Sequence, residues 1–278
     1  MRAALALLSL AIAGTAAGQP LLLPPAASAL APPPIEVRLI EGWQAADGSH
    51  IAAVEIRLAP GWYTYWRMPG EAGIPPVLDW SRSRNLASVR HEWPRPVVFK
   101  SYGLQTIGYA GELVLPVVLT PERPGEPVAA AVDLVFGACK DICVPGEARL
   151  EAELAPGRPP RGRERIEAAR AARPYTAEEA GVTSVTCGFD AGARGPELVA
   201  SVTFAGEPDP AKVMVIEPGQ RDLRIGPAES RSQGHTVSAR AAVRGGGAGG
   251  LAIDRGALRL TLIGPDRAVD IRGCRSPG

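Results

Sequence analysis

The chain has 278 residues, of which 46% are hydrophobic and 21% charged, and its formal net charge is +1. This length predicts one large domain or two smaller ones, and the near-zero charge argues against a nucleic-acid-binding surface, which normally carries a basic excess. Four cysteines are too few for the framework of a disulfide miniprotein, so each cysteine needs its own explanation.

The N-terminus has the pattern of a secretory signal peptide. Arg2 precedes an apolar run over residues 3–13, and small residues follow up to Gly18, after which we expect cleavage. A second candidate cleavage site lies at residues 27–29. The apolar run is too short for a membrane anchor. We therefore assign residues 1–18 to a signal peptide and residues 19–34 to a proline-rich, extended leader, and we expect no stable membrane insertion of the mature chain.

Residues 35–155 contain short β-like runs separated by glycine and proline clusters. This pattern is typical of a sandwich or barrel and not of alternating strands and helices. The runs lie at residues 35–39, 51–58, 113–119, 131–136 and 148–154.

Residues 156–181 differ, because they are rich in arginine, alanine and glutamate. We expect a solvated helical linker here, with a helix over residues 163–173 that Pro174 stops. In residues 182–278 the β-like runs return, at 182–189, 198–204, 213–217, 236–243, 258–263 and 268–271. The predicted fold class is therefore all-β, with two β-sandwich domains joined by a short helical linker.

The cysteines divide into two pairs of different spacing. A bridge between Cys187 and Cys274 closes nearly the whole second β-region and stabilises it by about 4–5 kcal/mol in the chain-entropy model. A bridge between Cys139 and Cys143 contributes only about 2 kcal/mol on the same basis. We therefore interpret Cys187–Cys274 as a structural disulfide, while the short pair invites a chemical explanation.

Three interpretations of the short pair remain open. Accessible thiolate chemistry with a nearby second sulfur favours a redox-active dithiol, and Lys140 would stabilise a thiolate. An inert hairpin disulfide is the second interpretation. The third is a Cu(I) site completed by His91 or Met68, the nearest soft or borderline ligands in the same domain.

Several motifs of the first β-region carry a family resemblance. They are residues 60–76 (PGWYTYWRMPGEAGIPP), 79–81 (DWS), 92–96 (EWPRP), 107–109 (IGY), 113–116 (LVLP) and 139–145 (CKDICVP). In this order they resemble the N-terminal periplasmic domain of the DsbD thiol:disulfide interchange family, and more closely its ScsB-type exported members. The resemblance covers residues 35–155. It implies an immunoglobulin-like β-sandwich in the periplasm.

The resemblance also implies roles for individual residues. Cys143 would form the mixed disulfide with partner proteins, and Cys139 would resolve it. Phe99 and Tyr102 match the segment whose aromatic side chains cap the pair in the family. Tyr65 is one of several other aromatic residues nearby, and on the sequence alone the sandwich core is the better assignment for it.

These observations lead to one preferred function and one alternative. We expect thiol:disulfide interchange, as in a protein-disulfide reductase, with no cofactor. The partners would be periplasmic thioredoxin-fold proteins and, because the sequence contains no membrane relay, a separate membrane electron donor. The alternative is a Cu(I)-binding or partner-docking module whose Cys139–Cys143 bridge is structural.

Overall fold

The computed structural model describes residues 35–277, except residues 72, 102, 194, 209, 210, 212, 221 and 246–251. The predicted signal peptide, the proline-rich leader and the cap residue Tyr102 therefore lie outside the described residues.

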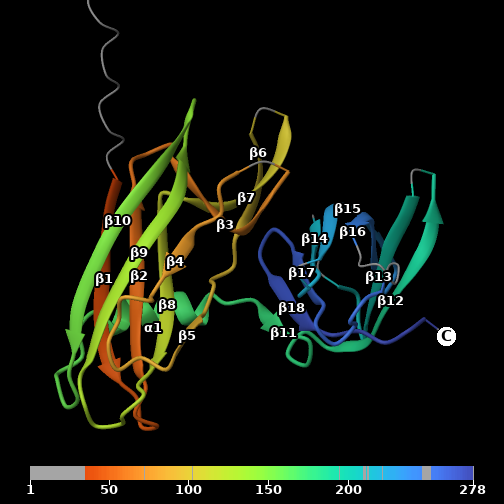
Figure 1. Ribbon diagram of the computed structural model, residues 1–278. Helices are drawn as coiled ribbons and strands as arrows, with labels where there is room; N and C mark the ends of the chain where they lie inside the picture. Colours follow the sequence, from red (N-terminus) through yellow and green to blue (C-terminus); the bar gives the residue numbers. More distant parts are fainter. Residues whose placement is uncertain are drawn as a thin grey trace, which may run out of the picture. The chain divides into compact units, whose positions relative to one another are not determined.

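The first β-region folds into two antiparallel sheets packed face to face (Figure 1). One sheet has the order β1-β2-β8-β5, formed by β1 (Ile35–Gln44), β2 (His50–Leu58), β8 (Glu112–Thr120) and β5 (Ser88–His91). The other has the order β10-β9-β3-β7-β6, with β4 paired to β9. Its strands are β10 (Cys143–Leu154), β9 (Val128–Cys139), β3 (Tyr63–Gly70), β7 (Leu104–Ala110), β6 (Val97–Ser101) and β4 (Val77–Asp79).

The alternation of apolar and polar residues explains this packing. Along β8 and β9 the apolar side chains that point between the sheets are buried, including Leu113, Leu115, Val132, Leu134 and Phe136. Their burial removes apolar surface from water, which is the main stabilising contribution in such a core. All five predicted runs of this region lie on strands, so they are confirmed.

The helix α1 (Arg163–Ala171) follows the first sandwich and packs on β8 and β1 (Figure 1). Its one buried apolar residue, Ile166, is fully buried against Ile40, Ile51 and Ala53. Arg165 of the helix pairs with the buried carboxylate of Glu55 on β2. The helix ends two residues earlier than predicted, and it covers a sheet, so it is not simply a solvated connector.

The C-terminal region forms a second pair of sheets. One has the order β11-β18-β17-β14, from β11 (Tyr175–Thr176), β18 (Ala268–Arg272), β17 (Arg259–Ile263) and β14 (Val213–Glu217). The other has the order β12-β13-β16-β15, from β12 (Val182–Gly192), β13 (Gly195–Phe204), β16 (Thr236–Gly245) and β15 (Leu223–Gln233). Their apolar faces enclose a separate core that includes Leu198, Val202, Met214, Val237 and Leu260.

The described residues thus form two β-sandwiches with one short helix between them, and the predicted fold class is confirmed. None of the helices in this part of the chain is long and apolar enough to cross a membrane.

Candidate functional site

The short-spaced cysteines lie at the tip of the β9–β10 hairpin. Cys139 ends β9 and Cys143 begins β10, and the two residues are direct partners in the ladder between these strands. Their Cα atoms are 4.1 Å apart and their sulfurs form a disulfide. The amide of Lys140 donates to the carbonyl of Ile142 and closes the turn between them. The hairpin therefore holds both sulfurs together without help from a distant part of the chain.

The two sulfur-bearing residues differ in burial. Cys139 is 0% exposed, whereas Cys143 is exposed. A reagent approaching from solvent therefore reaches Cys143 first. Such a difference separates the sulfur that another molecule can contact from the sulfur that only its neighbour can contact.

Tyr65 is the polar side chain that touches both sulfurs. Its hydroxyl lies 2.9 Å from Sγ of Cys139 and 3.2 Å from Sγ of Cys143. Strand β3 brings it there, because Tyr63 pairs with Cys139 and Thr64 with Ala138. The sequence left Tyr65 among the core aromatics. It is indeed buried, but its hydroxyl belongs to the site.

Two glycines make room for the Tyr65 ring. A Cβ atom at Gly137 would lie 2.9 Å from Cδ2 of Tyr65, and a Cβ atom at Gly73 would lie 2.4 Å from its Cε1. Gly73 also has a φ of 147°, which disfavours other residues. The hydroxyl of Thr64 donates to the carbonyl of Gly137 at 2.8 Å and fixes β3 against β9 at the same level. Small residues and one hydrogen bond therefore position the ring.

Phe99 lies on β6, in the hairpin formed with β7. Figure 1 shows this hairpin and the tip of β9–β10 at the same end of the first sandwich. The Phe99 ring packs edge-on against Tyr63 with centroids 4.6 Å apart, and Tyr63 in turn packs against Tyr65 at 5.7 Å. Phe99 is thus connected to the sulfurs through two tyrosines, which leaves its role as a cap a prediction.

Lys140 follows Cys139 in the turn. A Cβ atom at Gly61 would lie 3.3 Å from Cε and 3.7 Å from Nζ of Lys140, so the lysine side chain extends over the backbone of Gly61. Its amine is therefore held beside the turn that precedes β3.

Four exposed apolar residues lie in the turn between the cysteines, or on or against the sheet that carries them. Ile142 stands in the turn between the cysteines, and Ile74 lies 3.0 Å from a Cβ position at Gly137. Val135 and Val77 are partners across β9 and β4 on the same sheet. All four side chains are at least 40% exposed. Exposed apolar side chains such as Ile142, which stands directly between the two cysteines, are available for contact with another protein.

The residues considered for copper lie on β5 and β3. His91 is on β5, in the other sheet, and its Nε2 accepts a hydrogen bond from Nε1 of Trp80 at 3.3 Å. Met68 packs against the apolar core. Within the described part of the chain, no group of three or more histidine, cysteine, aspartate or glutamate side chains is arranged to hold a metal ion.

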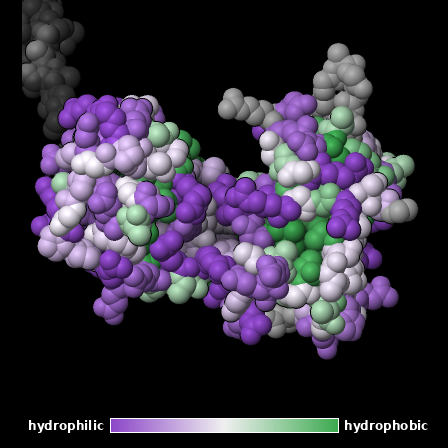
Figure 2. Space-filling view, turned by 90° about the horizontal axis from the view of Figure 1, so that it is seen from below, coloured by the Kyte–Doolittle hydropathy of each residue, from purple (hydrophilic) through white to green (hydrophobic). Residues whose placement is uncertain are grey.

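A cavity of about 750 Å³ lies away from the cysteines. Arginines predominate among its charged lining residues, and Figure 2 shows that hydrophilic residues predominate on one face of the molecule. Most of these arginines are engaged by carboxylates, such as Arg259 by Asp270 and Arg170 by Glu92. The cavity includes His91 but none of the predicted site residues.

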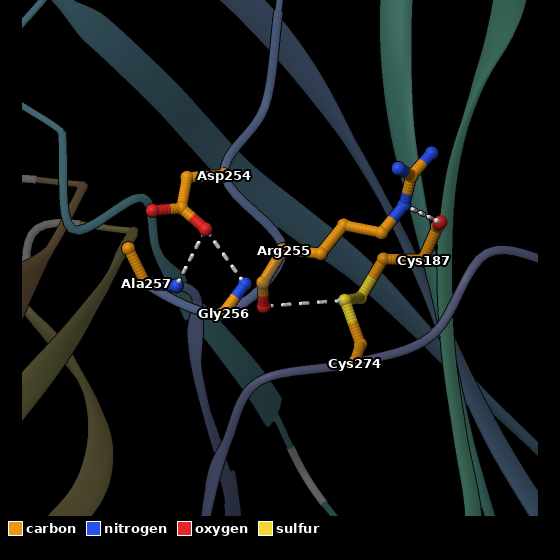
Figure 3. The surroundings of a disulfide bond; sticks show 6 residues. All are labelled: Cys187, Asp254, Arg255, Gly256, Ala257 and Cys274. Atoms are coloured by element: carbon orange, nitrogen blue, oxygen red, sulfur yellow. Dashed lines mark hydrogen bonds between the residues drawn. A yellow bond between two sulfur atoms is a disulfide. The ribbon is translucent and has the colours of Figure 1, made fainter.

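Cys187 and Cys274 form the second disulfide, shown in Figure 3. Cys187 is fully buried on β12, and its carbonyl accepts a hydrogen bond from Nε of Arg255 at 3.0 Å. The amide of Cys187 donates to the carbonyl of Arg275, and the amide of Cys274 to the carbonyl of Arg255. The bridge therefore joins the segment after β18 to β12, and its structural role stays a prediction.

The comparison with protein families identifies the first sandwich. Residues 36–155 match the family described as thiol:disulfide interchange protein DsbD, N-terminal. The first sandwich is thus similar to the DsbD N-terminal domain over its whole length. The two cysteines and Tyr65 all lie within this DsbD N-terminal domain.

Solved structures extend the likeness of the fold beyond the DsbD N-terminal domain. The N-terminal periplasmic domain of ScsB from Proteus mirabilis has a TM-score of 0.66 and 22% identity, over 88% of this chain and 94% of that chain. The N-terminal domain of Neisseria meningitidis DsbD in the reduced form has 20% identity over 42% of this chain and 83% of that chain, with a TM-score of 0.26. No curated protein matches the chain. The ScsB likeness therefore covers the fold of both sandwiches.

Proposed function

We propose that this chain carries out thiol–disulfide exchange through Cys139 and Cys143 in the periplasm. The observation that carries the proposal is the difference in burial between the two cysteines, on a hairpin of a DsbD N-terminal domain. Exchange proceeds by attack of a thiolate on a disulfide sulfur, so one sulfur must be accessible and a second must lie within reach. Cys143 meets the first requirement and Cys139 the second.

The exchange has two steps. In the reduced chain, the Cys143 thiolate attacks a sulfur of the partner's disulfide, and the partner's other sulfur leaves as a thiolate that takes up a proton. The Cys139 thiolate then attacks Sγ of Cys143, which re-forms the Cys139–Cys143 disulfide and releases the partner's second thiolate. The partner gains two electrons and two protons, the chain loses them, and no cofactor is involved.

Tyr65 contributes to this chemistry through its hydroxyl. A hydrogen bond to a charged acceptor is stronger than one to a neutral acceptor, so the hydroxyl stabilises a thiolate more than a disulfide sulfur. Because it lies within 3.2 Å of both sulfurs, it is placed to donate to the thiolate at each step.

The partners would be thioredoxin-fold proteins of the periplasm, with a separate membrane protein as the electron donor. The exposed apolar side chains of Ile142, in the turn between the cysteines, and of Ile74 support contact with another protein. Export through the predicted signal peptide at residues 1–18 would deliver the chain to that compartment.

We further propose a division of the mature chain into an exchange domain at residues 35–155, a linker at 156–181 and a second domain at 182–278. The separate sheets of the two sandwiches support this division. The disulfide between Cys187 and Cys274 lies wholly within the second domain and would be structural.

Trapping the mixed disulfide tests the proposal. In the exporting host, Cys139→Ser leaves Cys143 without its resolving sulfur, so we expect a covalent complex that dissolves on addition of dithiothreitol. The matched variant Cys143→Ser retains only the buried sulfur and should trap none. Failure of Cys139→Ser to trap any partner, together with a disulfide that glutathione buffers cannot reduce, would contradict the proposal.

A further inference from the structure

One side chain of the second sandwich holds the strand that carries Tyr65. Arg67 on β3 donates through Nε to Oε1 of Glu217 at 3.1 Å and through Nη2 to Oε2 at 2.8 Å. Its Nη2 also reaches Oγ1 of the buried Thr261 at 3.3 Å. The Arg67 and Glu217 side chains are only 13% and 18% exposed. A two-point contact between a guanidinium and a carboxylate fixes orientation as well as distance.

Apolar packing surrounds this ion pair. Val213 and Ile263 of the second sandwich are buried in the same cluster as Trp66, Ile107 and Tyr109 of the first. The Arg67 guanidinium also lies over the Trp66 ring, 4.0 Å from its centroid. Charges are weakly screened in such surroundings, and an ion pair held there keeps its geometry better than one on an open surface.

The hydrogen-bond ladder of β3 is interrupted where Arg67 contacts Glu217. The ladder between β3 and β7 pairs Tyr65 with Gly108, and it is then interrupted until Gly70 pairs with Thr106. On the other side, β3 pairs with β9 only at Tyr63 and Thr64. Residues 66–69 therefore lack a regular ladder. Between its paired ends at Tyr65 and Gly70, side-chain contacts such as that of Arg67 help to fix this stretch.

We propose that Glu217 is a positioning residue for the exchange site: by holding Arg67, it keeps β3 in register and the Tyr65 hydroxyl against the two sulfurs. The second sandwich would thereby set the redox equilibrium of a cysteine pair that lies in the first. This inference rests on the proposed exchange function and gives the second sandwich a role in it.

The effect has a definite sign. The Tyr65 hydroxyl stabilises the thiolate of the reduced pair, so a displaced hydroxyl makes reduction less favourable. The relevant reaction is the reduction of the Cys139–Cys143 disulfide by two molecules of glutathione, which yields the dithiol and one glutathione disulfide. We expect Glu217→Gln to lower its equilibrium constant about 3- to 10-fold, which is the loss of part of one charge-assisted hydrogen bond.

The experiment measures this equilibrium constant in the full chain. If glutathione buffers do not reduce half of the Cys139–Cys143 disulfide, dithiothreitol buffers replace them. Tyr65→Phe should shift the constant in the same direction, and Glu217→Gln should add almost nothing in the Tyr65→Phe background. Arg67→Lys keeps the charge but loses the two-point contact, so it should give a smaller shift than Glu217→Gln. Thermal unfolding confirms that each variant is folded.

Glu92→Gln is the matched control. Glu92 is 13% exposed, close to the 18% of Glu217, and it is likewise bound by an arginine, Arg170, yet among the described residues its side chain forms no hydrogen bond or ion pair with β3. Its loss should lower stability and leave the equilibrium constant unchanged. The inference is overturned if Glu217→Gln has the same equilibrium constant as the wild type. It is also overturned if Glu217→Gln lowers the constant as much in the Tyr65→Phe background as in the wild type, or if Glu92→Gln lowers the constant by the same factor. The proposed exchange function is tested separately, because it is contradicted when Cys139→Ser traps no covalent complex.

Discussion

The hydroxyl of Tyr65 lies 2.9 Å from the buried sulfur of Cys139, so a residue 74 positions earlier in the chain is in hydrogen-bond contact with the disulfide. The contact depends on β3 lying beside β9 and on small residues below the ring. Substitutions at residues other than Tyr65 and the cysteines can therefore alter its chemical effect.

Gly137→Ala tests that dependence. The added methyl group would stand 2.9 Å from Cδ2 and Cε2 of Tyr65 and 3.0 Å from Cβ of Ile74, so the ring must move. Overpacking of this kind costs about 1–3 kcal/mol of unfolding free energy. We also expect the Cys143 thiol of the reduced chain to be alkylated more slowly at neutral pH, since the hydroxyl that stabilises its thiolate is displaced.

Chemical denaturation and the rate of thiol alkylation at neutral pH measure these two effects. Gly206→Ala is the control, because nothing lies within 4 Å of a Cβ atom there. If Gly137→Ala were alkylated at the wild-type rate, the ring would not be positioned by this glycine.

The second disulfide gives a contrasting prediction. Replacing both Cys187 and Cys274 with alanine removes a bridge that spans 87 positions of sequence. The chain-entropy model gives a loss of about 4–5 kcal/mol in the unfolding free energy. Because the bridge joins β12 to the segment after β18 and leaves Glu217 on β14 in place, the reduction equilibrium of the Cys139–Cys143 pair should stay within twofold of the wild-type value in the folded double variant. Thiol titration and urea unfolding, each with and without reductant, test both statements, and a large change in that equilibrium would show that the bridge is more than structural.

The sequence predicted the strands whose apolar residues alternate, because alternation directly reports burial on one face. Strand β3 was not predicted. Its residues Tyr63–Gly70 are aromatic and then irregular, and its register is set by contacts with β7 and β9. The cysteine pair was predicted from its spacing and family motifs, whereas the Tyr65 hydroxyl contact arises only when β3 and β9 meet. The interrupted ladder after Tyr65 and the ion pair of Arg67 with Glu217 are likewise long-range features.

The docking of α1 provides a third test. Ile166 is fully buried against Ile40, Ile51 and Ala53, and it is the only buried residue of the helix. Truncation to alanine leaves a cavity in that cluster and should cost about 2–4 kcal/mol. Glu167→Ala, which alters the exposed face of the same helix, should cost under about 0.5 kcal/mol. Equal losses for the two variants, measured by urea denaturation, would mean that the helix is held by its charged residues instead.

A buried histidine and a partly buried one should make the fold sensitive to mild acid. Burial lowers the pKa of His50 and of His91 below the ordinary value of 6.5, because the charged imidazolium loses its hydration. His50 is 2% exposed, and its Nε2 has no hydrogen-bond partner among the residues that the structure describes. Above pH 6.5 both states of the chain hold neutral imidazoles, so these groups do not affect stability there. As the pH falls below 6.5, the unfolded chain takes up protons that the folded chain resists, and the unfolding free energy declines until the folded-state pKa values are passed.

The variant His50→Gln/His91→Gln should flatten this decline. Urea unfolding at intervals between pH 7.5 and pH 5 gives the slope of the unfolding free energy against pH. The difference between the two proteins at pH 7.5 gives the pH-independent change in unfolding free energy that the substitutions themselves cause. We expect the wild-type slope over this interval to exceed that of the double variant, since the substituted side chains bind no protons in either state. Parallel profiles would place the acid sensitivity in other groups and would show that the two imidazoles are hydrated well enough to titrate normally.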